Sequence, residues 1–144
     1  MKFRKTICSI LLLIIVCLCG CTTSPDHVIK EVNIQKLNKK AQTFVQTIND
    51  RNGLFLYSLI NEDQFLIVKY STVVQGDEAK YLSNITAEIA DRILIINIEE
   101  MGTDKYDDDR LNKTRIFQLP NEKDYDNIQI FKNGEETMID SVGV

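Results

Sequence analysis

The side chains with the clearest capacity for chemistry lie at the start of this 144-residue chain. All four cysteines occur at or before Cys21, and His27 is the only histidine. Beyond Cys21 there is no thiol for an internal disulfide, a cysteine zinc site or a cysteine–histidine dyad. His27 follows in a polar segment that contains Pro25, so we expect a solvated linker residue rather than a catalytic base.

The first twenty residues have the order of an export signal. A basic start with Lys2, Arg4 and Lys5 precedes an apolar run from Ile7 to Cys19 that only Ser9 interrupts. A membrane-spanning helix needs roughly 20 apolar residues, and this run is shorter. We therefore expect a signal peptide that is removed; the alternative is an uncleaved amino-terminal anchor.

The end of this segment, Leu18-Cys19-Gly20-Cys21, resembles the lipobox of bacterial lipoproteins. That box has an aliphatic residue, a small residue, Gly, Ala or Ser, and then the modified cysteine. Cys19 stands at the second place, where Ala, Ser or Thr is more usual. The resemblance extends over residues 1–21 only. It implies diacylglycerol transfer to the Cys21 sulfur, cleavage between Gly20 and Cys21, and acylation of the new amino terminus with a chain such as palmitate.

Acyl chains on Cys21 would hold the protein at a membrane. Stable attachment requires two chains, or one chain with a basic patch, and a diacylglyceryl group supplies two. We therefore expect a lipid-anchored protein of the bacterial cell membrane that faces outside the cytoplasm. The expected organisation is a signal peptide over residues 1–20, the lipidated cysteine and a tether over 21–32, and one globular domain over 33–144.

The exported part is acidic. The first twenty residues carry three basic and no acidic side chains, so the remainder has 14 basic and 21 acidic groups and a net charge of −7. A domain with this charge is not suited to general nucleic-acid binding, because the phosphate backbone attracts basic surfaces. We expect no nucleic-acid partner.

The domain begins with a predicted amphipathic helix over 33–50. Its apolar residues recur every three or four positions, and lysines lie on the opposite face. We expect the apolar stripe to pack on a core; the alternative is a basic face lying on anionic lipid. The stripe consists of Ile34, Leu37, Ala41, Phe44 or Val45, and Ile48, and the opposite face carries Lys36, Lys39, Lys40, Thr43 and Gln46.

Strand patterns follow the helix. Residues 82–89 alternate as a strand, although 79–91 also fit a helix, and Asn133-Gly134 predicts a type I′ hairpin turn. The other predicted strands are 54–60, 65–71, 93–99, 114–119, 127–132 and 135–140. The class is therefore α+β and mostly β: one amino-terminal helix and six or seven mainly antiparallel strands in a small sandwich or partial barrel.

An acidic stretch between two predicted strands is the best candidate for a metal site. Four carboxylates within six residues could bind Ca²⁺, and Glu99 and Glu100 could join them from the strand end. The order does not match the helix–loop–helix calcium motif, so we expect a solvated loop and no metal. The four carboxylates are Asp104, Asp107, Asp108 and Asp109.

These patterns favour a non-enzymatic binding or interaction domain without a cofactor, whose partner is an unidentified envelope protein. No phosphate loop or dinucleotide fingerprint occurs. One alternative is a small-molecule or lipid carrier with an internal β cavity, for which the aromatic residues of the early strands could provide the lining. The other is a surface hydrolase that uses paired carboxylates. The aromatic residues, which we expect more often in a core, are Phe55, Tyr57, Phe65 and Tyr70.

Overall fold

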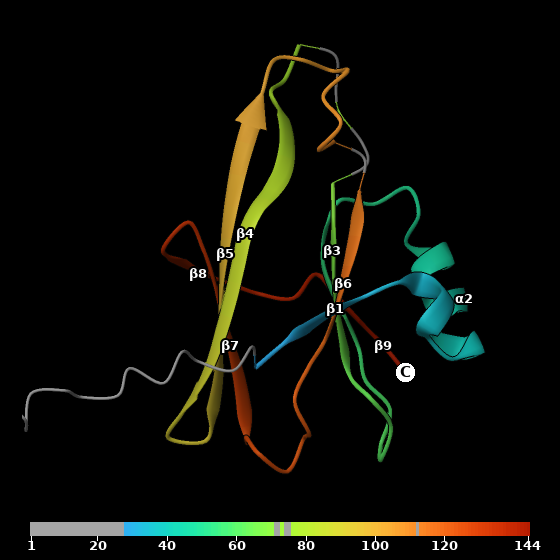
Figure 1. The fold of residues 1–144 in the computed structure, drawn as a ribbon, viewed down its shortest axis with the longest axis vertical. Helices are drawn as coiled ribbons and strands as arrows, with labels where there is room; N and C mark the ends of the chain where they lie inside the picture. Colours follow the sequence, from blue (N-terminus) through green and yellow to red (C-terminus); the bar gives the residue numbers. More distant parts are fainter. Residues whose placement is uncertain (1–27, 71–72, 74–75, 112) are drawn as a thin grey trace, which may run out of the picture.

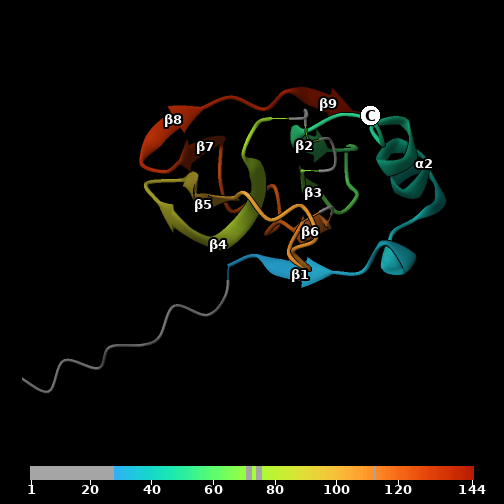
Figure 2. The same cartoon turned by 90° about the horizontal axis from the view of Figure 1, so that it is seen from above.

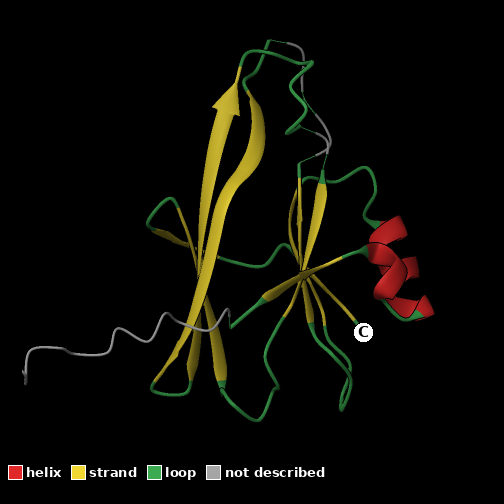
Figure 3. Cartoon of the chain, viewed as in Figure 1, coloured by secondary structure: helices red, strands yellow, loops and turns green. Residues whose placement is uncertain are grey.

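The computed structural model describes residues 28–70, 73, 76–111 and 113–144. The predicted signal peptide, the lipidation site Cys21 and His27 lie outside the described residues. The folded part has three layers: helix α2 (Lys39–Thr47), a five-stranded sheet and a four-stranded sheet (Figure 1). The helix lies on the side of the five-stranded sheet that faces away from the four-stranded sheet (Figure 3).

The first sheet lies in the middle of these layers. Its order is β1 (Lys30–Val32), β6 (Thr114–Gln118), β3 (Phe65–Lys69), β2 (Gly53–Tyr57) and β9 (Ser141–Gly143). All neighbours are antiparallel except β2 and β9, which run parallel. Every residue of β3 is buried, because one face of the strand meets the helix and the other meets the second sheet.

The second sheet contains the longest strands of the fold. Its order is β4 (Ala79–Ala90), β5 (Ile93–Thr103), β7 (Asn127–Lys132) and β8 (Glu135–Thr137). Here β5 and β7 run parallel and the other pairs are antiparallel. The view from above in Figure 2 shows the two sheets facing each other.

Apolar side chains fill the space between the sheets. Leu66 and Val68 of β3 pack with Leu94, Ile96 and Ile98 of β5, and all five are at most 1% exposed. Burial of this apolar area is the main favourable term that holds the two sheets together. The predicted sandwich and its high strand content are thus present. The partial barrel is wrong, since the strands form two open sheets, and the sheets are mixed rather than uniformly antiparallel.

The helix packs through the predicted apolar stripe, with the exception of Ile34, which lies before the helix and is exposed. Its buried side chains contact the outward face of the first sheet in a second core cluster, while Lys36, Lys39 and Lys40 are exposed. The predicted start at residue 33 is wrong. Asn38 caps α2 by accepting the Ala41 N–H at 2.8 Å, and residues 34–36 form a separate 3₁₀ turn. The buried members of the stripe are Leu37, Ala41, Val45 and Ile48.

Two tight turns match their local sequence. Asn133 and Gly134 have φ values of 52° and 84°, which confirms the predicted type I′ turn between β7 and β8. Asp91 and Arg92 join β4 to β5 with φ values of 49° and 62°. The segment 79–91 is therefore strand and turn, and the helical alternative for it is wrong.

The chain enters the fold earlier than predicted. Ile29 is 8% exposed and packs in the core between the sheets, and Lys30–Val32 pair with β6. The predicted tether over 21–32 is therefore too long at its carboxyl end. A three-residue strand is too short for a periodic pattern, so only its long-range pairing shows that it exists.

The last strand creates a close contact that offers a test of the fold. A methyl group at Gly143 would lie 2.4 Å from ring carbons of Phe44 in α2. We expect Gly143→Ala to lower the free energy of unfolding by about 1–3 kcal/mol, because the helix must shift away from β9. Val142→Ala is the matched control, since Val142 is 54% exposed and should change stability by less than about 0.5 kcal/mol. Equal urea midpoints for the two variants would contradict the close contact between the Phe44 ring and Gly143 of β9.

Candidate functional site

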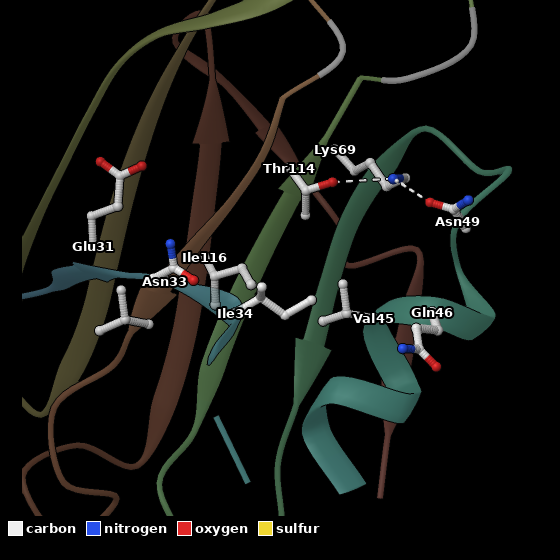
Figure 4. A pocket seen from close by; sticks show the side chains of 10 residues that line it. Glu31, Asn33, Ile34, Val45, Gln46, Asn49, Lys69, Thr114 and Ile116 are labelled. Carbon is white, nitrogen blue, oxygen red and sulfur yellow. Dashed lines mark hydrogen bonds between the residues drawn. The ribbon is translucent and has the colours of Figure 1, made fainter. Parts of the chain in front are cut away.

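A buried lysine lies at the end of the fully buried strand. Lys69 is 4% exposed and is the one charged residue in the buried class among the residues described. Its Nζ donates hydrogen bonds to Asn49 Oδ1 at 3.2 Å and to Thr114 Oγ1 at 3.1 Å (Figure 4). Thr114 is the register partner of Lys69 on β6, and Asn49 follows α2, so the helix and sheet layers both contribute to the site.

The ammonium group of Lys69 has neutral hydrogen-bond partners among the described residues. Burial lowers the pKa of Lys69, and the nearby Asp50 carboxylate opposes this effect. A lysine ammonium has three donors, whereas the described part of the chain gives Nζ two hydrogen-bond partners, both neutral, and no ion pair. The described residues therefore leave one donor of the ammonium group without an acceptor.

An open cleft of about 700 Å³ lies beside Lys69. One part of its wall is apolar, with Ile34, Val45 and Ile116 below Lys69 and Thr114 in Figure 4. The other part is polar. Pockets of this volume, with an apolar wall and a few polar groups, are typical of small-ligand sites. The polar lining consists of Lys69, Asn49, Thr114, Gln46, Asn33 and Glu31, and Val32 completes the apolar wall.

The acidic residue of the cleft is engaged elsewhere. Glu31 accepts two hydrogen bonds from Arg115, at 2.8 and 2.7 Å, and lies across the cleft from Lys69 in Figure 4. The bond from Arg115 lowers the pKa of Glu31, so the carboxylate stays ionised and paired at neutral pH. The Lys69 end of the cleft therefore favours an acceptor that carries negative charge.

The predicted acidic stretch does not assemble a site. Asp108 holds the Arg110 guanidinium through bonds at 2.9 and 2.6 Å, and this bond lowers the pKa of Asp108 far below its usual range. Arg110 also donates to the Tyr81 hydroxyl at 2.6 Å and lies over the Tyr81 ring. Asp104, Asp107 and Asp109 are exposed.

The two glutamates expected to join the acidic stretch are also placed apart from it. Glu99 is exposed, and Glu100 pairs with Lys80 at 3.4 Å and Lys132 at 3.6 Å. Within the described ranges, no three acidic, histidine or cysteine side chains meet at a common point.

The aromatic residues of the early strands belong to the cores. Phe55, Tyr57 and Phe65 pack under the helix, and Tyr70 packs against the core between the sheets. The hydroxyl groups of Tyr57 and Tyr70 are buried without a hydrogen-bond partner in the part of the chain that is described. Burial, followed by the nearby Glu100 carboxylate, raises the pKa of Tyr70, so this side chain stays neutral.

Sequence reasoning did not single out Lys69. The available signal was its place inside the run Phe65 to Tyr70, which is apolar on both faces and therefore predicts burial of whatever side chain it contains. Its two partners lie 20 and 45 residues away in the chain, and no local pattern connects them.

Comparisons with family models, with curated proteins and with solved structures find no match to this chain. No helix among the residues described is long and apolar enough to cross a membrane.

The lowered pKa of Lys69 predicts a pH effect on stability. Above the lowered pKa the folded chain releases the proton while the unfolded chain holds it up to about pH 10.4. The free energy of unfolding rises with pH wherever the unfolded state binds more protons. The destabilisation caused by burying Lys69 should therefore become smaller as pH rises in this window. We expect the free energy of unfolding of the natural chain, minus that of Lys69→Met, to increase between pH 7 and pH 10.

Urea titrations at several pH values measure this difference. Lys80→Met is the control, because the Lys80 side chain is 48% exposed. Parallel pH profiles for the natural chain and Lys69→Met would contradict the burial of a titrating ammonium group.

Proposed function

We propose that this chain is a lipid-anchored, extracytoplasmic binding protein, and that its folded domain binds a small organic anion in the cleft beside Lys69. The function is binding rather than catalysis. Lys69 contacts the neutral side chains of Asn49 and Thr114, neither of which exchanges a proton at ordinary pH.

The anchor rests on the sequence of residues 1–21. Its basic start, its apolar run and the lipobox-like Leu18-Cys19-Gly20-Cys21 agree with one another. Six residues lie between Cys21 and Val28, where the described fold begins, and they span at most about 25 Å. An anchored Cys21 would therefore keep the β1 side of the domain close to the lipid surface.

The ligand class rests on the Lys69 ammonium group, which has two hydrogen-bond partners among the described residues and lies at the polar end of a cleft with an apolar wall. A carboxylate at this end would accept the third hydrogen bond of Nζ, and charge-assisted bonds of this kind are roughly twice as strong as neutral ones. The apolar part of the same ligand would cover Ile34, Val45 and Ile116. A small acid with an apolar body fits both requirements.

The packing of the core favours this surface site over an internal carrier cavity. Twelve buried residues form one contiguous cluster between the sheets. The cleft beside Lys69 opens to solvent. A ligand would therefore enter from the surface without separation of the sheets.

The anchor is tested by labelling with palmitate in bacteria that express the full chain. We expect the label to enter the natural chain and the Cys19→Ala control, and to be absent from Cys21→Ala. The Cys21→Ala chain should also leave the lipid-anchored fraction. Label in Cys21→Ala, or no label in the natural chain, would contradict anchoring through this sulfur.

The ligand class is tested with hexanoate, which combines a carboxylate with an apolar chain. The readout is the NMR signals of Asn49 and Thr114 in the detergent-extracted full chain. We expect saturable shifts with hexanoate, and about tenfold weaker binding of acetate, 1-hexanol and the Lys69→Met variant. Lys80→Met should bind as the natural chain does. Equal affinity of Lys69→Met and the natural chain would contradict the proposal.

A further inference from the structure

Strand β4 forms a long free edge of the second sheet. It has twelve residues, lies at the end of the sheet order and, among the residues described, pairs only with β5. The edge lies on the same side of the sandwich as β1, the edge strand of the first sheet (Figure 2). The opposite edge of the second sheet is the three-residue strand β8.

The carboxyl-terminal half of β4 lacks the features that usually prevent an edge strand from pairing with another chain. The irregularity in the pairing of β4 with β5 lies between Leu82 and Asn84, and the pairing is regular from Asn84 to Ala90. This stretch contains one charged residue, Glu88, and neither proline nor glycine. Natural edges are commonly blocked by lysine, proline or bulges. Among the residues described, β5 is the only segment that pairs with the backbone of this stretch, so outward N–H and C=O groups remain open.

A groove runs beside this open backbone. It has a volume of about 480 Å³ and lies between residues 84–87 of β4 and residues 28–31 of the amino-terminal segment. Ile85 and Ala87 pack toward the core and Phe117 lines the same groove. Since side chains alternate along a strand, a strand added to β4 would place every second side chain in this groove. There it would lie near the apolar side chains of Ile85, Ala87 and Phe117, and the groove is also lined by Lys30, Glu31 and Arg115.

The other side chains of an added strand would lie on the solvent face of the second sheet. The register places three acidic residues on this face, one each on β4, β5 and β8, and none of the β4, β5, β7 and β8 residues on the same face is basic. Opposite charges on neighbouring strands attract, and like charges repel. The three acidic residues are Glu88, Glu99 and Glu136.

We propose that the free edge of β4 binds an extended peptide segment of another protein by strand addition, and that this segment alternates apolar and basic residues. The backbone supplies the hydrogen bonds, the groove receives the apolar side chains, and Glu88 attracts the basic ones. This groove shares only Glu31 with the lining of the Lys69 cleft. The inference goes beyond the proposed function and does not depend on it.

The probe is a fluorescent eight-residue peptide that alternates valine and lysine, added to the detergent-extracted full chain. We expect saturable anisotropy and slower hydrogen exchange at alternate amides between Asn84 and Ala90. A valine–glutamate peptide should bind about tenfold more weakly. A peptide with four valines followed by four lysines should also bind more weakly, because it cannot alternate. Equal binding of the three peptides, or no protection of β4 amides, would overturn the proposal.

A charge reversal provides the matched variant pair. Glu88→Lys should exchange the preference, so that the valine–glutamate peptide binds better than the valine–lysine peptide. Glu136→Lys reverses a charge on the same face at the opposite edge and should keep the original preference. Both variants must retain the unfolding midpoint of the natural chain. Protection of the β4 amides without peptide, in a sample that sediments as a dimer, would assign the edge to a second copy and overturn the proposal.

Discussion

The structure depends on the burial of β2 and β3 on both faces. Leu54 and Leu56 face the second sheet, while Phe55 and Tyr57 face the helix. Neither face of this hairpin can meet water without exposing several large apolar side chains, so two further layers are needed. The same constraint decides the environment of Lys69. It ends a strand that has no solvent side, and its ammonium group bonds to oxygen atoms of Asn49, which follows the helix, and of Thr114 on the neighbouring strand.

The sequence predicts the parts of the fold that are set by local periodicity and turn chemistry. The strand 127–132 and the Asn133-Gly134 turn are present as predicted, because positive φ and alternation are local properties. The apolar stripe of the helix also packs as predicted. The helix starts later than the apolar periodicity from Ile34 predicts. The Asn38 side chain accepts the Ala41 N–H and caps α2, so the residues before Asn38 are not part of the helix.

The remaining features depend on contacts between distant residues. Strands β1 and β9 have three residues each and exist through pairing with β6 and β2. The parallel pairs β2–β9 and β5–β7 cannot be inferred from short connections, which favour antiparallel neighbours. The Lys69 site has the same origin, because its partners come from the end of the helix and from β6. By contrast, the acidic stretch is a local pattern that the sequence alone reveals. In the structure Asp108 forms an ion pair with Arg110.

In the proposed function, this small domain would bind its partners near a membrane. Local positive charge at Lys69 exists in a domain whose overall charge is negative, so recognition of an anion must come from hydrogen bonding at short range rather than from the overall field. The free β4 edge lies beside the segment through which the chain enters the fold. Tethering would raise the local concentration of partners there, and modest affinities would then suffice.

The central claim is that Lys69 is a buried ammonium group with a free donor facing the cleft. The most direct measurement is the NMR titration of its side-chain carbon next to Nζ, with the other lysines of the same chain as internal references. We expect the pKa of Lys69 to lie below the usual value of a lysine side chain, and saturating hexanoate to raise it because the carboxylate stabilises the charged form. A pKa of Lys69 at the usual lysine value, unchanged by hexanoate, would contradict the burial of this ammonium group beside the cleft.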